Sequence, residues 1–278
     1  FKGLPDHLQI WPAHGAGSAC GKALGAVPSS VLGYEKIANW AFKITTEEEF
    51  VEAILDGQPE PPKYFAMMKR LNKEGPAILM ADYQPPRQEA KRLPKVLEQA
   101  TLLDLRGAEA FAEEHPKNAL FLPSGTAFVN WAGWLLSYEE DIYLLLRDES
   151  ELETFFRGLG SIGLDNVRGY FLPADLGVEV PMQSSKRIEA DEVDGKHPIL
   201  DVRSQKEWEE GHLQGAIHIH LGYLQDRMDE VPDEPVVHCR SGLRSLIASS
   251  VLQRAGKNPV DVLGGYTALK AQKKVALV

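Results

Sequence analysis

The sequence predicts an α/β protein in which parallel sheets are flanked by helices and one folding unit occurs twice in succession. Three observations predict it. Short apolar strands alternate with helical stretches, the chain matches itself at an offset of 97 residues, and a cysteine followed by a glycine-containing loop joins a strand to a helix. Strand and helix alternation with short connections favours a parallel sheet covered by helices. The 278 residues suit about two or three such compact units.

The composition is that of an ordinary globular protein. Hydrophobic residues make up 44%, charged residues 25%, and the net charge is −10. This acidic balance argues against nucleic acid or a membrane surface as the main partner. The uncharged run over residues 118–138 is interrupted by Pro123 and Gly125, so no transmembrane helix is predicted. Two cysteines, Cys20 and Cys239, are too few for a disulfide scaffold, so we predict free thiols and a cytoplasmic location.

The internal repeat organises most of the chain. The match carries an Asp-x-Arg pattern, an aromatic residue and a histidine from the first copy onto the second without a gap. The aligned pairs are Asp104 with Asp201, Arg106 with Arg203, Phe111 with Trp208 and His115 with His212. Because chance rarely produces such a match, we predict two homologous domains, residues 87–181 and 182–278, after a segment of residues 1–86. The chain opens at Phe1 with no leader pattern, and we interpret it as a fragment.

Cys239 ends an apolar strand and opens a helix, so its loop is the chemically informative site. The unpaired N–H groups and the positive dipole end of a helix N-terminus favour an anion. Arg240 and Arg244 add positive charge, and Gly242 permits the turn that directs N–H groups inward. We therefore predict that Cys239 is a thiolate nucleophile in a small anion cradle.

The length of this loop restricts which anion it can bind. Cysteine phosphatases and arsenate reductases use Cys-x5-Arg, which is wide enough for a tetrahedral oxyanion. Here the arginine comes after four residues, as Arg244, and Ser245 stands where a phosphatase has its arginine. The tighter cradle favours the terminal sulfur of a persulfide over a phosphate. An arsenate reductase or phosphatase, and a catalytically silent binding or regulatory module, are the alternatives.

The motifs of the second copy resemble the rhodanese family of sulfurtransferases over nearly the whole of residues 184–278. The resemblance is carried by Asp201-Val202-Arg203, Glu207-Trp208, Gly211 to Ile217, Cys239 to Ser245 and Gly264-Gly265-Tyr266. It implies that Cys239 accepts a sulfane sulfur and passes it to a thiol, sulfite or cyanide. The residues that match the family's active loop, and that the resemblance implies bind the substrate, are Arg240, Ser241, Gly242, Leu243 and Arg244. Thiosulfate, low-molecular-weight thiol persulfides and sulfite are the implied small-molecule partners. Asp201, Arg203 and His212 match an upstream motif that we interpret as a supporting hydrogen-bond and packing frame.

The N-terminal segment resembles a different family. The stretch from Gln9 to Gly21, which holds His14 and Cys20, resembles the last metal-site motif of metallo-β-lactamase-fold proteins fused to two rhodanese domains and related to persulfide dioxygenases. The resemblance implies that residues 1–86 are the C-terminal remnant of such a domain plus a linker. One histidine cannot hold a metal, so no cofactor is expected in this chain. Fe(II) or Zn at His14 is expected only with the complete domain, and Cys20 is a candidate sulfur relay or a packing residue.

Two further features are interpreted as structural. The first copy also resembles a rhodanese, but it contains no cysteine, so we predict a catalytically silent domain. His218 and His220 share one face of a strand, but no further ligand follows at suitable spacing, so no metal site is predicted there. The sequence leaves the oligomeric state open, with a homo-oligomer among the options.

Overall fold

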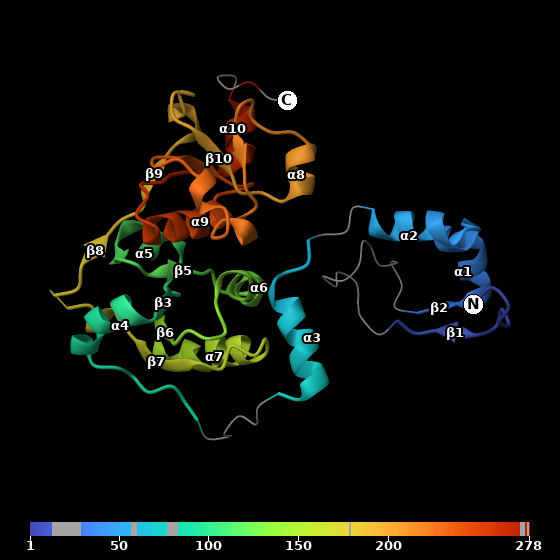
Figure 1. Cartoon of the computed structure of the whole chain (residues 1–278), viewed down its shortest axis with the longest axis horizontal. Coiled ribbons are helices and arrows are strands. Elements are labelled where there is room, and N and C mark those ends of the chain that lie inside the picture. Colours follow the sequence, from blue (N-terminus) through green and yellow to red (C-terminus); the bar gives the residue numbers. More distant parts are fainter. Residues whose placement is uncertain (13–28, 57–59, 77–82, 178, 273–275, 277) are drawn as a thin grey trace. The chain divides into compact units, whose positions relative to one another are not determined.

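The computed structural model describes residues 1–12, 29–56, 60–76, 83–177, 179–272, 276 and 278. The chain divides into two compact units, residues 1–61 and residues 62–278. Both repeats lie in the second unit (Figure 1). The predicted α/β class with parallel sheets is confirmed. Among the described residues, no helix combines the length and the apolar character needed to cross a bilayer.

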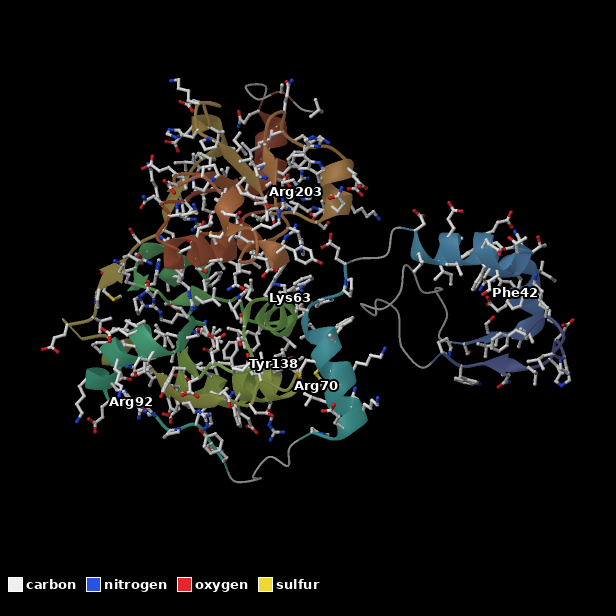
Figure 2. All side chains as sticks on the ribbon, in the orientation of Figure 1. Phe42, Lys63, Arg70, Arg92, Tyr138 and Arg203 are labelled. Atoms are coloured by element: carbon white, nitrogen blue, oxygen red, sulfur yellow. The ribbon has the colours of Figure 1, made fainter. Side chains whose placement is uncertain are left out.

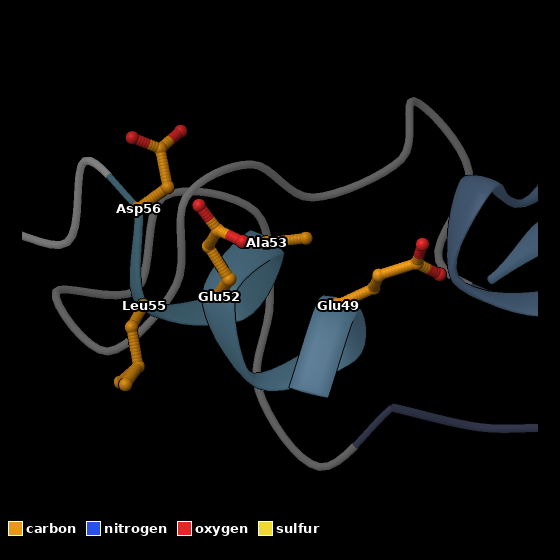
Figure 3. A pocket seen from close by; sticks show the side chains of 5 residues that line it. All are labelled: Glu49, Glu52, Ala53, Leu55 and Asp56. Carbon is orange, nitrogen blue, oxygen red and sulfur yellow. The ribbon is translucent and has the colours of Figure 1, made fainter. Parts of the chain in front are cut away.

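The first unit is small, and Leu32 is the single fully buried side chain among its described residues. Its elements are β1 (Gln9–Ile10), β2 (Ser30–Val31), α1 (Leu32–Ala38), η1 (Trp40–Lys43) and α2 (Glu47–Leu55), with β1 and β2 antiparallel. Helix α2 begins after Thr46, because the Thr46 hydroxyl accepts the Glu49 N–H at 3.3 Å and caps the first turn. A depression on α2, lined by Glu49, Glu52, Ala53, Leu55 and Asp56, contains none of the predicted site residues (Figure 3).

The first repeat forms a parallel four-stranded sheet in the order β5-β3-β6-β7. The strands are β3 (Thr101–Asp104), β5 (Leu120–Phe121), β6 (Ile142–Leu145) and β7 (Val167–Phe171). Its helices are α4 (Leu93–Gln99), α5 (Ala108–Glu113), α6 (Thr126–Leu135) and α7 (Leu152–Gly160), and α3 (Tyr64–Glu74) precedes the repeat in the same compact unit. Helix α3 packs Tyr64 and Met68 against the core of this unit, although the sequence assigned it to the N-terminal segment.

The second repeat forms a parallel five-stranded sheet in the order β11-β10-β12-β13-β9. The strands are β9 (Lys186–Ile188), β10 (Ile199–Asp201), β11 (Ile217–His218), β12 (Val236–His238) and β13 (Val260–Val262). The helices are α8 (Gln205–Glu209), α9 (Leu243–Arg254) and α10 (Gly265–Ala271). A short antiparallel pair, β4 (His115–Pro116) with β8 (Met182–Gln183), connects the two repeats.

The two sheets share one strand order. In the first repeat, β3 lies between β5 and β6, and β7 lies beyond β6. In the second repeat, β10 lies in the same way between β11 and β12, and β13 lies beyond β12. In each repeat, the outer strand also pairs with a segment from the start of that repeat. Strand β9 pairs with β13 in the second repeat, and Arg87 forms a parallel bridge to Tyr170 of β7 in the first. The repeat found in the sequence is therefore also a repeat of topology.

Helix α9 joins the two repeats. All side chains over residues 245–252 are buried, and the helix contacts β5 and α5 of the first repeat as well as β12 and β13 of the second (Figure 1). The Ser250 hydroxyl accepts the Phe121 N–H at 3.1 Å, and Arg254 donates to the Thr101 hydroxyl at 3.0 Å. A helix whose side chains are buried all around must be covered on both sides, and here the two repeats cover it together.

Candidate active site

Cys239 lies directly after β12 and is 1% exposed. The Gly242 N–H donates to its Sγ at 3.2 Å. Gly242 has φ of +106° and is the N-cap residue of α9, a conformation that glycine adopts without steric cost. The Ser245 hydroxyl donates to the Gly242 carbonyl at 3.0 Å and stabilises the turn. The sulfur thus lies at the N-terminus of a 12-residue helix, where backbone N–H groups and the helix dipole stabilise negative charge.

The start of α10 holds this loop from behind, which the sequence analysis did not identify. The Tyr266 N–H donates to the Cys239 carbonyl at 2.7 Å, and the Thr267 N–H and hydroxyl donate to the Arg240 carbonyl at 3.1 and 2.9 Å. A Cβ on Gly265 would lie 2.4 Å from the Cys239 carbonyl oxygen. Only glycine therefore allows the two backbones to approach this closely. The sequence analysis noted Gly264-Gly265-Tyr266 as a motif, but it did not predict that these residues contact the Cys239 loop.

The two arginines of the loop are placed differently. Arg240 is exposed, and its guanidinium forms no ion pair with the described residues. Arg244 forms a bidentate ion pair with Glu207 of α8, with N–O distances of 2.6 and 2.7 Å. Burial raises the pKa of Glu207, but the hydrogen bonds and charge of Arg244, together with Ser204, outweigh it and lower the pKa to about 2. The positive charge of Arg244 is therefore balanced by the negative charge of Glu207.

The remaining predicted cradle residues differ in their exposure. Ser241 and Leu243 are exposed, whereas Gly242 is buried and donates its N–H to the sulfur. The structure thus brings Cys239 and Gly242 into contact and leaves Ser241 and Leu243 at the surface of the loop. Glu207, which the sequence analysis noted only as part of a motif, is the residue that contacts Arg244. His14 and Cys20 lie outside the described residues.

Asp201 and Arg203 form the buried frame of the domain. Arg203, labelled in Figure 2, pairs with Asp201. Its Nη2 lies 2.6 Å from Asp201 Oδ2, and the two side chains are 3% and 0% exposed. Arg203 also donates to the Gly211 carbonyl at 2.9 Å and lies 3.8 Å from the centroid of the Tyr266 ring. These contacts bond β10, the segment after α8 and the start of α10 to one another. The frame therefore supports the loop through α10.

Comparisons with known proteins agree with this geometry. Residues 183–272 match the Rhodanese-like domain family. The chain is 35% identical over 91 residues to the "Putative sulfurtransferase YtwF" of Bacillus subtilis, covering 32% of this chain and 85% of that protein. This chain belongs to the rhodanese family. A second relative of this rhodanese domain, "Thiosulfate sulfurtransferase 16, chloroplastic" of Arabidopsis thaliana, is 33% identical over 104 residues, which cover 32% of this chain and 87% of that protein.

A solved structure extends the similarity beyond the rhodanese domain. A metallo-beta-lactamase from Staphylococcus aureus is 39% identical, with a TM-score of 0.51, and the match covers 62% of this chain and 47% of that chain. The chain thus spans about half the length of that protein. Since the rhodanese domain is about a third of the chain, the match includes residues outside it.

The histidines of the rhodanese domain have structural partners. His212 Nδ1 lies 3.0 Å from the Trp208 carbonyl, and Trp208 stacks on both His212 and His218 at centroid distances of 3.5 and 4.7 Å. His218 Nε2 lies 2.9 Å from the Arg203 carbonyl. His220 packs against aromatic rings of the first repeat. Within the described residues, no group of three or more His, Cys, Asp or Glu side chains is arranged to hold a metal ion.

The first repeat makes the same frame contacts as the rhodanese domain, at residues offset by 97. Arg106 pairs with Asp104 at 2.7 Å and donates to the Glu114 carbonyl at 2.7 Å. His115 stacks on Phe111, and its Nδ1 lies 2.6 Å from the Phe111 carbonyl. Because a repeat without cysteine keeps these contacts, they indicate a role in folding rather than in sulfur chemistry.

The cysteine position of the first repeat holds a leucine. The strand registers align Leu146 with Cys239, and Leu146 is fully buried. The carboxylate of Asp148 caps the following η3 (Glu149–Glu151) by accepting the Ser150 N–H at 2.9 Å. In the first repeat, a carboxylate two residues after the cysteine position thus caps the next helical turn.

Asp261 of β13 is buried in the rhodanese domain, and its surroundings predict that the stability of the fold depends on pH. It is 0% exposed, neither oxygen has a hydrogen-bond partner among the described residues, and Arg187 Nε lies 3.4 Å away. Burial raises the pKa of Asp261 from 3.8 to about 6, against the smaller lowering effects of Ser245 and Arg187. The folded state therefore binds more protons than the unfolded state between these values, and stability falls as the pH rises from about 4 to about 6.

Asp261→Asn is expected to abolish this loss. Above pH 6, the variant should be more stable than the wild type by up to about 3 kcal/mol, and the difference should shrink toward pH 4. Urea unfolding across this pH range measures it. Asp233→Asn, at a side chain that is 93% exposed, is the control. A variant less stable than the wild type at pH 7 would contradict the prediction.

Proposed function

We propose that this chain is a sulfurtransferase in which Cys239 carries a sulfane sulfur between a donor and an acceptor. The observation that supports it is the buried Cys239 Sγ, which accepts the Gly242 N–H at the N-terminus of α9. The donors are thiosulfate or low-molecular-weight thiol persulfides, and the acceptors are a thiol, sulfite or cyanide. The sulfurtransferase names of the relatives support the same reaction class.

The chemistry follows a ping-pong scheme. The Cys239 thiolate attacks the sulfane sulfur of the donor, and the bond from that sulfur to the donor breaks with its electron pair leaving on the donor. The product is the Cys239 persulfide, whose terminal sulfur carries the negative charge. The N–H groups at the start of α9 stabilise this charge. The acceptor then attacks the terminal sulfur, and the electron pair returns to Sγ.

The environment of Ser245 disfavours the phosphatase or arsenate reductase alternative. Ser245 stands where those enzymes place an arginine, and its side chain is fully buried and hydrogen-bonded to the Gly242 carbonyl. A tetrahedral oxyanion would therefore lack the bidentate donor that binds its oxygens. A silent binding module is disfavoured for the rhodanese domain because the cysteine lies at the helix N-terminus.

For the first repeat, residues 87–181, we propose a rhodanese-like fold that is catalytically silent. Its strand order and frame contacts match those of the rhodanese domain. Leu146 provides no nucleophile, and Asp148 already caps the adjacent helix. Its role in this proposal is structural, because β5 and α5 cover one side of α9.

For residues 1–86, we propose the C-terminal remnant of a metallo-β-lactamase-like domain in a longer fusion protein. The similarity to the Staphylococcus aureus protein, which reaches beyond the rhodanese domain, supports it. The longer protein would join a persulfide dioxygenase to this sulfurtransferase in the sulfide and persulfide metabolism of the cytoplasm. The described residues offer no group of three metal ligands, so no step of the mechanism uses a metal.

The test is mass spectrometry of the chain after incubation with thiosulfate. The intact mass should rise by one sulfur atom, cyanide should remove it, and peptide mapping should place it on Cys239. Protein alkylated beforehand with iodoacetamide is the control and should gain nothing. An unchanged mass, or a sulfur atom on a peptide without Cys239, would reject the proposal.

A further inference from the structure

The charged side chains of the Cys239 loop and of the frame differ in whether an opposite charge is paired with them. Arg244 interacts electrostatically with Cys239 and is paired with Glu207, whereas Arg240 is exposed and without an ion pair in the described residues. Asp201 and Arg203 neutralise each other in the frame below. Among the described residues, Arg240 is therefore the arginine of the loop whose positive charge has no carboxylate partner.

From this arrangement, which rests on the proposed function, we infer that Glu207 determines the charge of the sulfur donor that the cradle accepts. By neutralising Arg244, it selects donors that carry one negative charge over donors that carry two. Glu207 acts through Arg244 and is a specificity-determining, positioning residue rather than a catalytic one.

The structure holds Glu207 in this position independently of any ligand. Glu207 completes a capping box at the start of α8: its carboxylate accepts the Ser204 N–H at 3.1 Å, and its own N–H donates to the Ser204 hydroxyl at 3.3 Å. Its side chain is 19% exposed and that of Arg244 is 21% exposed. A half-buried bidentate pair in this setting keeps its charges in fixed places.

The carboxylate stays ionised under all conditions in which transfer can be measured, because the pKa of Glu207 is lowered to about 2. Arg244 is therefore neutralised throughout. A donor with two charges enters a site that contains the thiolate and only one unpaired cation, so the second charge of the donor has no partner. In a partly desolvated site, such an unpaired charge is costly.

Two donors of similar size separate this effect from the chemistry. Thiosulfate carries two negative charges and methanethiosulfonate carries one. Each gives the same Cys239 persulfide, with sulfite leaving from the first and methanesulfinate from the second. The number of charges is conserved in both steps, and no oxidant or reductant is needed. With cyanide as the acceptor, kcat/KM for each donor reports only the first half-reaction.

The experiment measures the ratio of kcat/KM for thiosulfate to kcat/KM for methanethiosulfonate. Glu207→Gln should raise this ratio about tenfold, because Arg244 becomes an unpaired cation while glutamine still accepts the Ser204 N–H. Arg244→Gln should lower it. The double variant, whose pair is again neutral in sum, should return to the wild-type ratio.

Glu209→Gln is the matched control, since Glu209 lies on the same helix and its carboxylate accepts from Gln205. A ratio that changes equally in Glu207→Gln and Glu209→Gln, or a double variant that keeps the Glu207→Gln ratio, would overturn the inference and leave the proposed function intact. If the wild type transfers sulfur from neither donor, the proposed function itself fails. Thermal unfolding of each variant identifies loss of fold, and Arg244→Gln then tests the inference in the opposite direction.

Discussion

Replacing Cys239 by serine is expected to lower kcat/KM for sulfur transfer from thiosulfate to cyanide at least about a thousandfold. A serine hydroxyl is not ionised near neutral pH and forms no persulfide, so the first half-reaction has no nucleophile. The Gly242 N–H and the helix dipole would remain, but they act on a charge that no longer forms. Thiocyanate production measures the rate.

The same variant should fold normally. Cys239 is 1% exposed, and serine is of similar size and can accept the Gly242 N–H. Thermal unfolding monitored by circular dichroism is the control for this. Cys20→Ser is measured in the same assay, because a lower rate in that variant would indicate that Cys20 relays sulfur. If Cys239→Ser retained more than a tenth of the wild-type rate, the nucleophile would have to be another group.

Gly265→Ala is expected to destabilise the domain by about 3 kcal/mol and to prevent persulfide formation. The new Cβ would lie 2.4 Å from the Cys239 carbonyl oxygen and 3.0 Å from backbone atoms of Arg240 and Ser241. These are backbone atoms of the cradle, so relief of the clash must displace the cradle itself. The residue also has φ of +54°, which costs about 1 kcal/mol for alanine.

Gly256→Ala separates the two causes. Gly256 has φ of +80°, but a Cβ there meets nothing within 4 Å. It should therefore lose about 1 kcal/mol and keep persulfide formation. Urea unfolding and the mass gain with thiosulfate measure both variants. Equal losses of stability in the two variants would show that close packing of Gly265 on the loop has no energetic effect.

The features that the sequence predicts well are local or repeated. The strand, the cysteine and the helix N-terminus of the active loop are consecutive in the chain, so their juxtaposition needs no knowledge of tertiary contacts. The offset of 97 residues predicts equivalent frames in the two repeats, and the Asp104–Arg106 and Asp201–Arg203 pairs have equivalent contacts.

The features that the sequence does not predict depend on distant partners. The charge of Arg244 indicates an anion but does not reveal Glu207, which lies 37 residues away and uses the same carboxylate to cap α8. Gly265 reads as a turn residue until Cys239 is placed against it. Helix α9 contains Ser245, Ser249 and Ser250 among its buried residues, so its sequence does not reveal that it is covered on both sides or that the first repeat covers one of them.

Helix α9 has a consequence for how this protein loses its structure. Its apolar side chains belong to one hydrophobic cluster that includes Leu120 and Phe121 of the first repeat and Leu200 and Val237 of the second. Melting either repeat alone would expose that cluster to water, at a cost of about 25 cal/mol for each Å² uncovered. The two repeats are therefore expected to unfold cooperatively, so a substitution in the copy without cysteine can shorten the lifetime of the copy that has it.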